Sequence, residues 1–234
     1  MNNLLILKYK FIYGWHILSW LIWYIPLRTV FRFKGSKPRD EDISTRPLIV
    51  VVNHKSLWDP WFYTHTLNFK QFLMSAPMQA MATQRFNSSF LNLIYYIFIK
   101  PFIYFPYGVL TLPTPKEGIK LALEEKTKPY KDVLKHNGSI FVFPEGGLKR
   151  MPGIHEFKRG ATYLQKEIGA PILLASIRFI KNDGYPGIQW WLPWTKRIVN
   201  WDNKLTYIPK EIINDDIKSA EFLKAKVEKL YNKV

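Results

Sequence analysis

The chain contains no cysteine among its 234 residues. This absence excludes a disulfide framework, a thiol nucleophile and any metal site with cysteine ligands. Acidic residues are also scarce, because 18 Asp and Glu stand against 34 Lys and Arg. The resulting formal net charge of +16 favours anionic partners, which include nucleic acid, anionic lipid and phosphorylated substrates.

Aromatic residues are abundant in contrast, at 16% of the chain. Tryptophans gather toward the start (Trp15, Trp20, Trp23, Trp58 and Trp61) and toward the end (Trp190, Trp191, Trp194 and Trp201). Trp and Tyr favour the membrane–water interface, where part of the ring is dry and its polar group is wet. We therefore expect a membrane surface as partner and no nucleic acid, because the basic residues are spread along the chain without a recognised nucleic-acid motif.

Residues 11–27, FIYGWHILSWLIWYIPL, contain no Asp, Glu, Lys or Arg and are flanked by Lys8, Lys10 and Arg28. A membrane-spanning helix needs about 20 apolar residues, and this stretch is slightly shorter and carries polar positions. It predicts a hydrophobic helical segment that anchors residues 1–40 at a membrane interface, on the cytoplasmic face. A helix buried in the protein core remains the alternative.

Residues 41–234 are expected to form one domain, because hydrophobic residues make up 47% of the chain and suffice for a core. Apolar runs that predict strands alternate with stretches of helical periodicity, which indicates an α/β fold with a mixed central sheet flanked by helices. We predict strands over residues 47–52, 139–143 and 171–177, helices over about 59–67, 156–168 and 216–233, and strands or hairpins within 182–210.

Two short polar motifs directly follow predicted strands. NHKSLWD spans residues 53–59, after the strand over 47–52, and FPEGG spans 143–147, at the end of the strand over 139–143. In an open α/β sheet the ligand binds beyond the carboxyl ends of the strands. The two turns are therefore expected to meet in one cleft, which suggests a catalytic site.

His54 and Asp59 are the candidate catalytic residues of the first motif. Histidine accepts and returns a proton near neutral pH. A carboxylate five residues later, at the start of a helix, can fold back onto the imidazole and fix its tautomer. Ser56 lies between them, so a covalent route is conceivable, and a structural histidine beside helix-capping residues is the alternative for such a short pattern.

The second motif supplies Glu145 and two glycines, Gly146 and Gly147. A glycine-rich turn after a strand can point backbone N–H groups at an anion. Positive side chains follow at Lys149, Arg150 and Lys158, and they either hold an anion near this turn or are ordinary surface charges.

Taken in order, these motifs resemble those of the glycerolipid acyltransferases of the 1-acyl-sn-glycerol-3-phosphate (lysophosphatidate) acyltransferase family. NHKSLWD matches the family's NHxxxxD at Asn53, His54 and Asp59. FPEGGLKR matches the first four residues of FPEGTRS, and FKRGATYLQKEIGAPILLASI at residues 157–177 resembles the segment that follows in the family. The resemblance covers about residues 45–180.

The resemblance implies an O-acyltransferase of phospholipid biosynthesis or remodelling, without metal or cofactor. The acyl donor would be acyl-CoA or acyl-carrier protein, and the acceptor a lysophospholipid, first of all 1-acylglycerol-3-phosphate. His54, held by Asp59, would deprotonate the acceptor hydroxyl, and residues 90–112 would enclose the acyl chain. The implied substrate-binding residues are Asn53, Glu145, Gly146, Gly147, Lys149, Arg150, Lys116 and Lys158.

Two departures from the family pattern leave the acceptor open. Thr114 stands where the second motif carries an arginine, and Gly147 and Leu148 replace the Thr and Arg of the third. Lys116, Lys149 and Arg150 are candidate substitutes, although lysine lacks the bidentate fork of arginine. A non-catalytic lipid-binding protein and a lipid esterase using Ser56 remain alternatives, and the oligomeric state is undetermined.

Overall fold

The structure is a computed structural model, and it describes residues 3–29, 33–56, 59–75, 78–82, 93, 96–97, 105, 107–111, 123–148, 153–180 and 196–233. The helices are α1 (Asn3–Thr29), α2 (Asp40–Ser44), α3 (Asp59–Thr66), α4 (Phe69–Ser75), α6 (Leu123–Lys135), α7 (Gly160–Ile168) and α8 (Asp216–Tyr231). The strands are β1 (Phe33–Lys34), β2 (Leu48–Val52), β3 (Met78–Ala82), β4 (Leu110–Thr111), β5 (Ser139–Val142), β6 (Ile172–Phe179) and β7 (Arg197–Trp201).

The strands form a seven-stranded mixed sheet in the order β1-β7-β6-β2-β5-β3-β4. Strand β2 lies at its centre and pairs in parallel with both β5 and β6. Val51 stands opposite Val142 on β5 and opposite Leu174 on β6, so the carboxyl ends of all three strands point toward the same edge. Strand β7 runs antiparallel to β6, which makes the sheet mixed, as expected.

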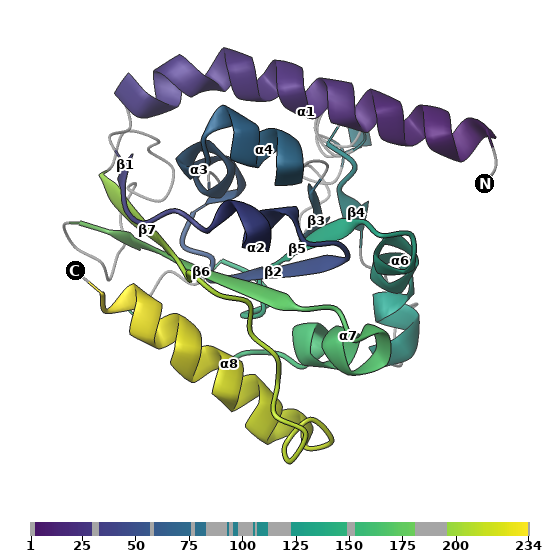
Figure 1. Cartoon of the computed structure of the whole chain (residues 1–234), viewed down its shortest axis with the longest axis vertical. Helices are drawn as coiled ribbons and strands as arrows, with labels where there is room; N and C mark the ends of the chain where they lie inside the picture. Colours follow the sequence, from purple (N-terminus) through teal and green to yellow (C-terminus); the bar gives the residue numbers. More distant parts are fainter. Residues whose placement is uncertain are drawn as a thin grey trace.

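Helices cover both faces of this sheet (Figure 1), which confirms the predicted α/β class. On one face, Ile49 and Val51 of β2 pack in a buried cluster with residues of α6, α7 and α8. On the other face, Leu48, Val50 and Val52 pack with residues of α1 and α3. A central parallel strand buried on both sides is apolar throughout rather than alternating, which is the pattern of residues 48–52.

Helix α1 lies across α3 and α4 on the outside of the second layer (Figure 1). Trp20 on its inner face contacts α3 in two ways. Its Nε1–H donates to Thr64 O at 3.3 Å, and its ring stacks on that of His65 with centroids 5.7 Å apart. Among the described residues, no helix combines the length and the apolar character that crossing a membrane requires. The anchoring role expected for residues 11–27 stays a prediction.

Several predicted boundaries shift in the structure. The helix expected from residue 156 begins only at Gly160, although it ends as predicted at Gly169, which has a φ of +73°. After α6 the left-handed residue is Asn137, with a φ of +58°. The next residue has to be glycine for a steric reason, because a Cβ on Gly138 would meet the Cγ1 of Val133 at 2.5 Å.

Candidate active site

The His54 imidazole and the Asp59 carboxylate are in direct contact beyond the carboxyl end of β2. His54 Nδ1 lies 3.1 Å from Asp59 Oδ2. Asp59 is fully buried, whereas about 15% of the His54 side chain is exposed. With its Nδ1–H donated to the carboxylate, the imidazole presents the Nε2 lone pair as its proton-accepting atom.

Asp59 also shapes the turn that carries His54. Its Oδ2 accepts the backbone N–H groups of Lys55 at 2.5 Å and Ser56 at 2.7 Å, and its Oδ1 accepts the Ser56 hydroxyl at 2.6 Å. Asp59 is the first residue of α3, so residues 55–56 wrap back over the helix start. The carboxylate therefore orients the imidazole and holds its turn at once.

Glu145 fastens the second motif to the first. Its Oε2 accepts the backbone N–H of His54 at 3.0 Å, and its Oε1 accepts the backbone N–H of His155 at 2.9 Å. The residue is only 1% exposed. Both carboxylate oxygens thus accept hydrogen bonds from backbone N–H groups. Substrate binding by Glu145 stays a prediction.

Asn53 plays a comparable role at the end of β2. Its side-chain amide donates to Ile177 O at 2.9 Å and accepts from Ile177 N at 2.8 Å, so it continues the hydrogen bonding between β2 and β6 beyond Val52. The Tyr63 hydroxyl donates to the carbonyl and side-chain oxygens of Asn53. Asn53 is fully buried, and its predicted contact with substrate remains untested.

The glycine turn lies beside the imidazole, because the ring of Phe143 stacks on His54 with centroids 4.0 Å apart. Gly146 and Gly147 are exposed, with φ values of +70° and +151°. Lys158 lies over this turn, and a Cβ on Gly146 would come within 2.7 Å of its Nζ. The exposed Lys158 ammonium therefore stands next to the turn, as an anion site would require.

The remaining predicted residues lie outside the described part of the chain. They are Lys116, Lys149, Arg150 and Thr114, together with most of the expected acyl-chain walls at residues 90–112. Within the part of the chain that the structure describes, no group of three or more His, Asp or Glu side chains could hold a metal ion.

Arg197, at the start of β7, is a buried residue of the site that the sequence did not predict. Its Nη2 lies 3.4 Å from the Ser56 hydroxyl oxygen, and the residue is fully buried. Burial lowers the pKa of Arg197 to about 10, and the Asp59 charge opposes that shift. No motif marks this position, because the contact depends on how β7 lies against β6.

Burial raises the pKa of Tyr63 well above its ordinary value, and the charges of Asp59 and Glu145 add to the effect. The Tyr63 phenol therefore stays protonated as a donor to Asn53. His54 and Asp59 thus lie in a network of buried hydrogen bonds. Such a network suits a site that has to keep one imidazole orientation.

The arrangement is similar to that of known proteins at two levels. Residues 31–178 match the sequence model of the family described as Acyltransferase. The crystal structure of the 1-acyl-sn-glycerophosphate (LPA) acyltransferase PlsC from Thermotoga maritima has a similar fold, with a TM-score of 0.51 and 18% sequence identity. That alignment covers 100% of this chain and 85% of the other. No curated protein has a significant sequence match to the chain.

Proposed function

The chain belongs to the acyltransferase family, and from this premise we propose that it transfers a fatty acyl group from an acyl thioester to the hydroxyl of a lysophospholipid. The single observation that carries the proposal is the His54–Asp59 contact of 3.1 Å beside the FPEGG turn. Such a pair is suited to remove a proton from a hydroxyl and to return it to a leaving group.

In this mechanism His54 Nε2 takes the proton of the acceptor hydroxyl while Asp59 stabilises the imidazolium that forms. The acceptor oxygen attacks the thioester carbonyl, and a C–O bond forms. The backbone N–H of Gly147 in the exposed turn is a candidate donor to the oxyanion, whereas that of Gly146 already donates to Phe143 O at 3.1 Å. When the C–S bond breaks, His54 returns the proton to the thiolate, which leaves an ester and a free thiol.

We propose acyl-CoA or acyl-carrier protein as the donor and 1-acylglycerol-3-phosphate as the first acceptor to test. A thioester is already activated, so the reaction asks only for a base and for oxyanion donors. The acceptor proposal is supported by the net charge of +16 and by the Lys158 ammonium beside the glycine turn. A lysophospholipid phosphate would find cationic side chains there.

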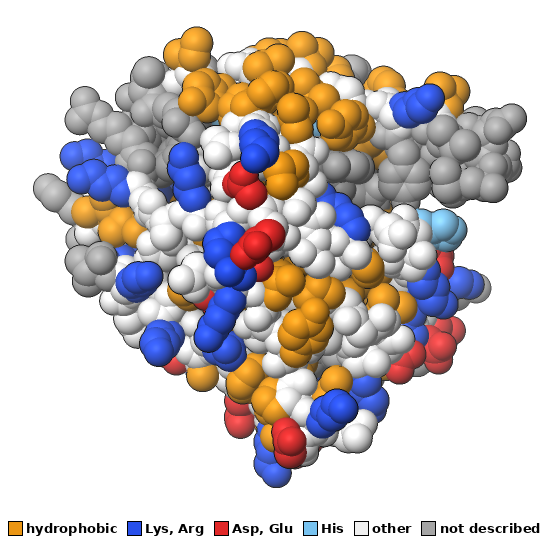
Figure 2. All heavy atoms as spheres, in the orientation of Figure 1, with side chains coloured by type: hydrophobic (Ala, Val, Ile, Leu, Met, Phe, Trp, Pro, Cys, Tyr) orange, Lys and Arg blue, Asp and Glu red, His pale blue; other side chains and the backbone are white. Residues whose placement is uncertain are grey.

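We also propose that the outer face of α1 lies in a membrane surface, on the cytoplasmic side. Exposed apolar side chains recur along this helix at helical spacing, and they are Leu7, Phe11, Leu18, Leu21, Ile22 and Ile25. Figure 2 shows hydrophobic side chains gathered along α1. An exposed apolar helix face next to exposed Lys8 and Lys10 is typical of helices that lie in the headgroup region.

The esterase alternative is disfavoured by the environment of Ser56. This residue is fully buried, and its hydroxyl proton is donated to Asp59 Oδ1 at 2.6 Å. A nucleophile has to reach the substrate carbonyl, and this oxygen faces the interior instead.

The decisive experiment measures thiol release from a panel of acyl-CoAs by the purified protein in lipid or detergent. Lysophosphatidate, other lysophospholipids and no acceptor are compared, and acyl-carrier protein replaces CoA in a parallel series. We expect release that depends on one acceptor and is lost in His54→Ala. Lipid binding without turnover for either donor would instead identify a non-catalytic lipid-binding protein.

A further inference from the structure

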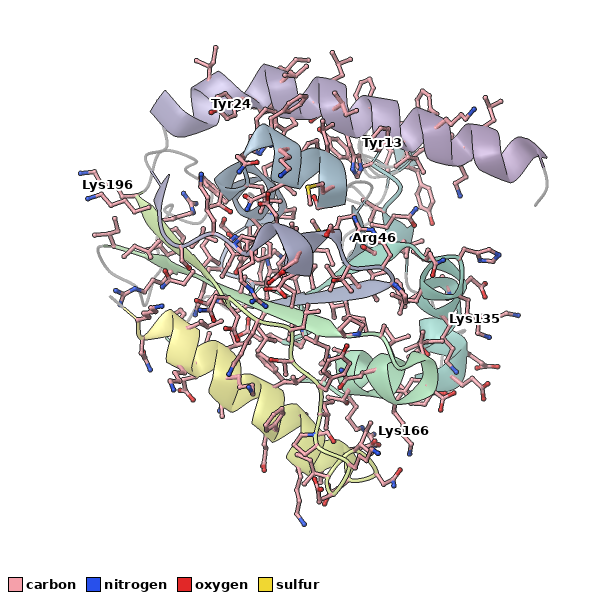
Figure 3. All side chains as sticks on the ribbon, viewed as in Figure 1. Tyr13, Tyr24, Arg46, Lys135, Lys166 and Lys196 are labelled. Carbon is pink, nitrogen blue, oxygen red and sulfur yellow. The ribbon has the colours of Figure 1, made fainter. Side chains whose placement is uncertain are left out.

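Arg197 is one of the largest fully buried side chains of the protein. Its guanidinium carbon lies 4.2 Å from the ring centroid of Phe62 on α3 and 4.7 Å from that of Phe179 on β6. The preceding residue, Lys196, is exposed, and its label in Figure 3 lies at the outer edge of the sheet. A buried charge costs several kcal/mol unless it is compensated, so this arginine needs a reason to be where it is.

The buried carboxylate of Asp59 can compensate the charge of Arg197. The Ser56 hydroxyl lies between the two side chains and contacts both. Arg197 Nη2 lies 3.4 Å from Ser56 Oγ, and Ser56 Oγ–H donates to Asp59 Oδ1 at 2.6 Å. The first distance is at the long end for a hydrogen bond. The main effect of the arginine on Asp59 is therefore electrostatic, and in a dry interior such an effect is large.

We propose that Arg197 is a positioning residue that balances the buried charge of Asp59 and thereby keeps His54 in its neutral, proton-accepting form. The inference rests on the proposed role of His54 as the base. A carboxylate beside an imidazole favours the imidazolium. A cation near Asp59 opposes this preference, and only the neutral imidazole can accept a proton from a hydroxyl.

The other charged and titratable groups around the dyad are consistent with this balance. Glu145 approaches His54 from the β5 turn with its second negative charge. Lys55 is buried, but its ammonium donates to Gly153 O and faces the Tyr231 ring of α8, on the other side of the sheet. Tyr63 stays neutral. Lys158, beside the glycine turn, is exposed and therefore screened by solvent. Arg197 is thus a buried cation whose hydrogen-bond contact leads to Asp59.

The test is an NMR titration of the histidine imidazoles in the full-length protein, with His54→Ala to assign the His54 signal. We expect the pH at the midpoint of the His54 titration to rise by about 0.5–1 unit in Arg197→Met. The same rise is expected in Arg197→Gln, which retains a hydrogen-bond donor. Arg197→Lys retains the charge and should restore the parent midpoint. Lys196→Met removes a neighbouring, solvent-screened charge and should leave the midpoint unchanged. An unchanged midpoint in a folded neutral variant would overturn the proposal.

A second measurement covers the case in which the neutral variants fold poorly. If the two charges compensate each other, Arg197→Met should destabilise the parent more than it destabilises an Asp59→Asn background, in thermal or denaturant unfolding. Equal destabilisation in both backgrounds would show that the arginine acts only by filling space, and it would also overturn the proposal.

Acyl-transfer assays at different pH values then test whether the charge of Arg197 affects catalysis. The acid limb of kcat/KM should move to higher pH in Arg197→Met by the same amount as the NMR midpoint. A parent protein without transferase activity would refute the proposed function, while the midpoint and the stability cycle would still decide the role of Arg197.

Discussion

The backbone N–H of His54 donates a hydrogen bond to Glu145 Oε2 at 3.0 Å, across two neighbouring parallel strands. This single bond ties the turn after β2 to the turn after β5. Glu145 completes the link by accepting the N–H of His155 with its other oxygen. The catalytic histidine candidate is therefore fixed at its backbone by Glu145 and at its side chain by Asp59.

Glu145→Gln tests this fastening role. The amide retains only one acceptor oxygen, so one backbone N–H would face an N–H₂ group, and we expect a loss of stability of about 1–3 kcal/mol. Denaturant unfolding measures it, and Glu221→Gln on the exposed surface of α8 is the control. A stable variant in which only the KM for the acceptor rises would favour substrate binding by Glu145 instead.

His54→Ala should lower the rate of acyl transfer by about 10²–10⁴-fold, the usual contribution of a general base. His136→Ala is the matched control, because this histidine is exposed at the end of α6. Initial rates of thiol release give the comparison. Full activity in folded His54→Ala would refute the assigned base.

Asp59→Asn preserves the size of the side chain but removes its charge. We expect kcat/KM to fall by about 10³–10⁴-fold, because the neutral amide no longer fixes the imidazole tautomer. The loss of an acceptor for the N–H groups of Lys55 and Ser56 should cost about 1–2 kcal/mol in stability. A variant with reduced stability but near-normal turnover would contradict the catalytic assignment.

His16 on α1 predicts a pH dependence of stability. Burial lowers the pKa of His16 below its ordinary value, while its hydrogen bond to Tyr107 O opposes the shift. The unfolded chain therefore takes up a proton as the pH falls below about 6.5 while the folded His16 does not, and stability is lost in that range. In urea titrations at pH 7.5 and 5.5, His16→Gln should lose less stability than the parent. Equal losses would contradict the prediction.

The outer face of α1 is tested with Leu21→Glu and Ile22→Glu, alone and together. A charge on a face that enters the headgroup region weakens binding, so we expect a marked loss of co-flotation with anionic vesicles. Ile217→Glu on α8 is the control, because Ile217 is similarly exposed but distant in sequence and fold. Unchanged flotation of the double variant would refute the membrane role of this face.

Much of the fold followed from local patterns. The apolar run at residues 47–52 predicts β2 to within one residue, and helix α8 lies within the range of 216–233 predicted for it. The edge at which the motifs meet was also predictable, since the carboxyl ends of parallel strands share one side of a sheet. The pairing of β2 with β5 confirms it.

Other features could not be predicted from local patterns. The short strand β3 has no clear strand signal and exists because it pairs with β5. The sequence did not identify the partners of Glu145, whose oxygens accept from backbone N–H groups of two other segments. Such contacts join residues 10 and 91 positions apart, and periodicity carries no information about them.

The sequence by itself determined the α/β class, the His54–Asp59 pair and the family, because these depend on residue types at short and fixed spacing. Only the tertiary structure decided the surroundings of that pair. Arg197 is 138 residues beyond Asp59 in the chain, and it reaches Ser56 because β7 folds back antiparallel to β6 and presents its first side chain to the interior. The charge environment of a buried carboxylate depends on distances in space, and these are set by the packing of the whole sheet.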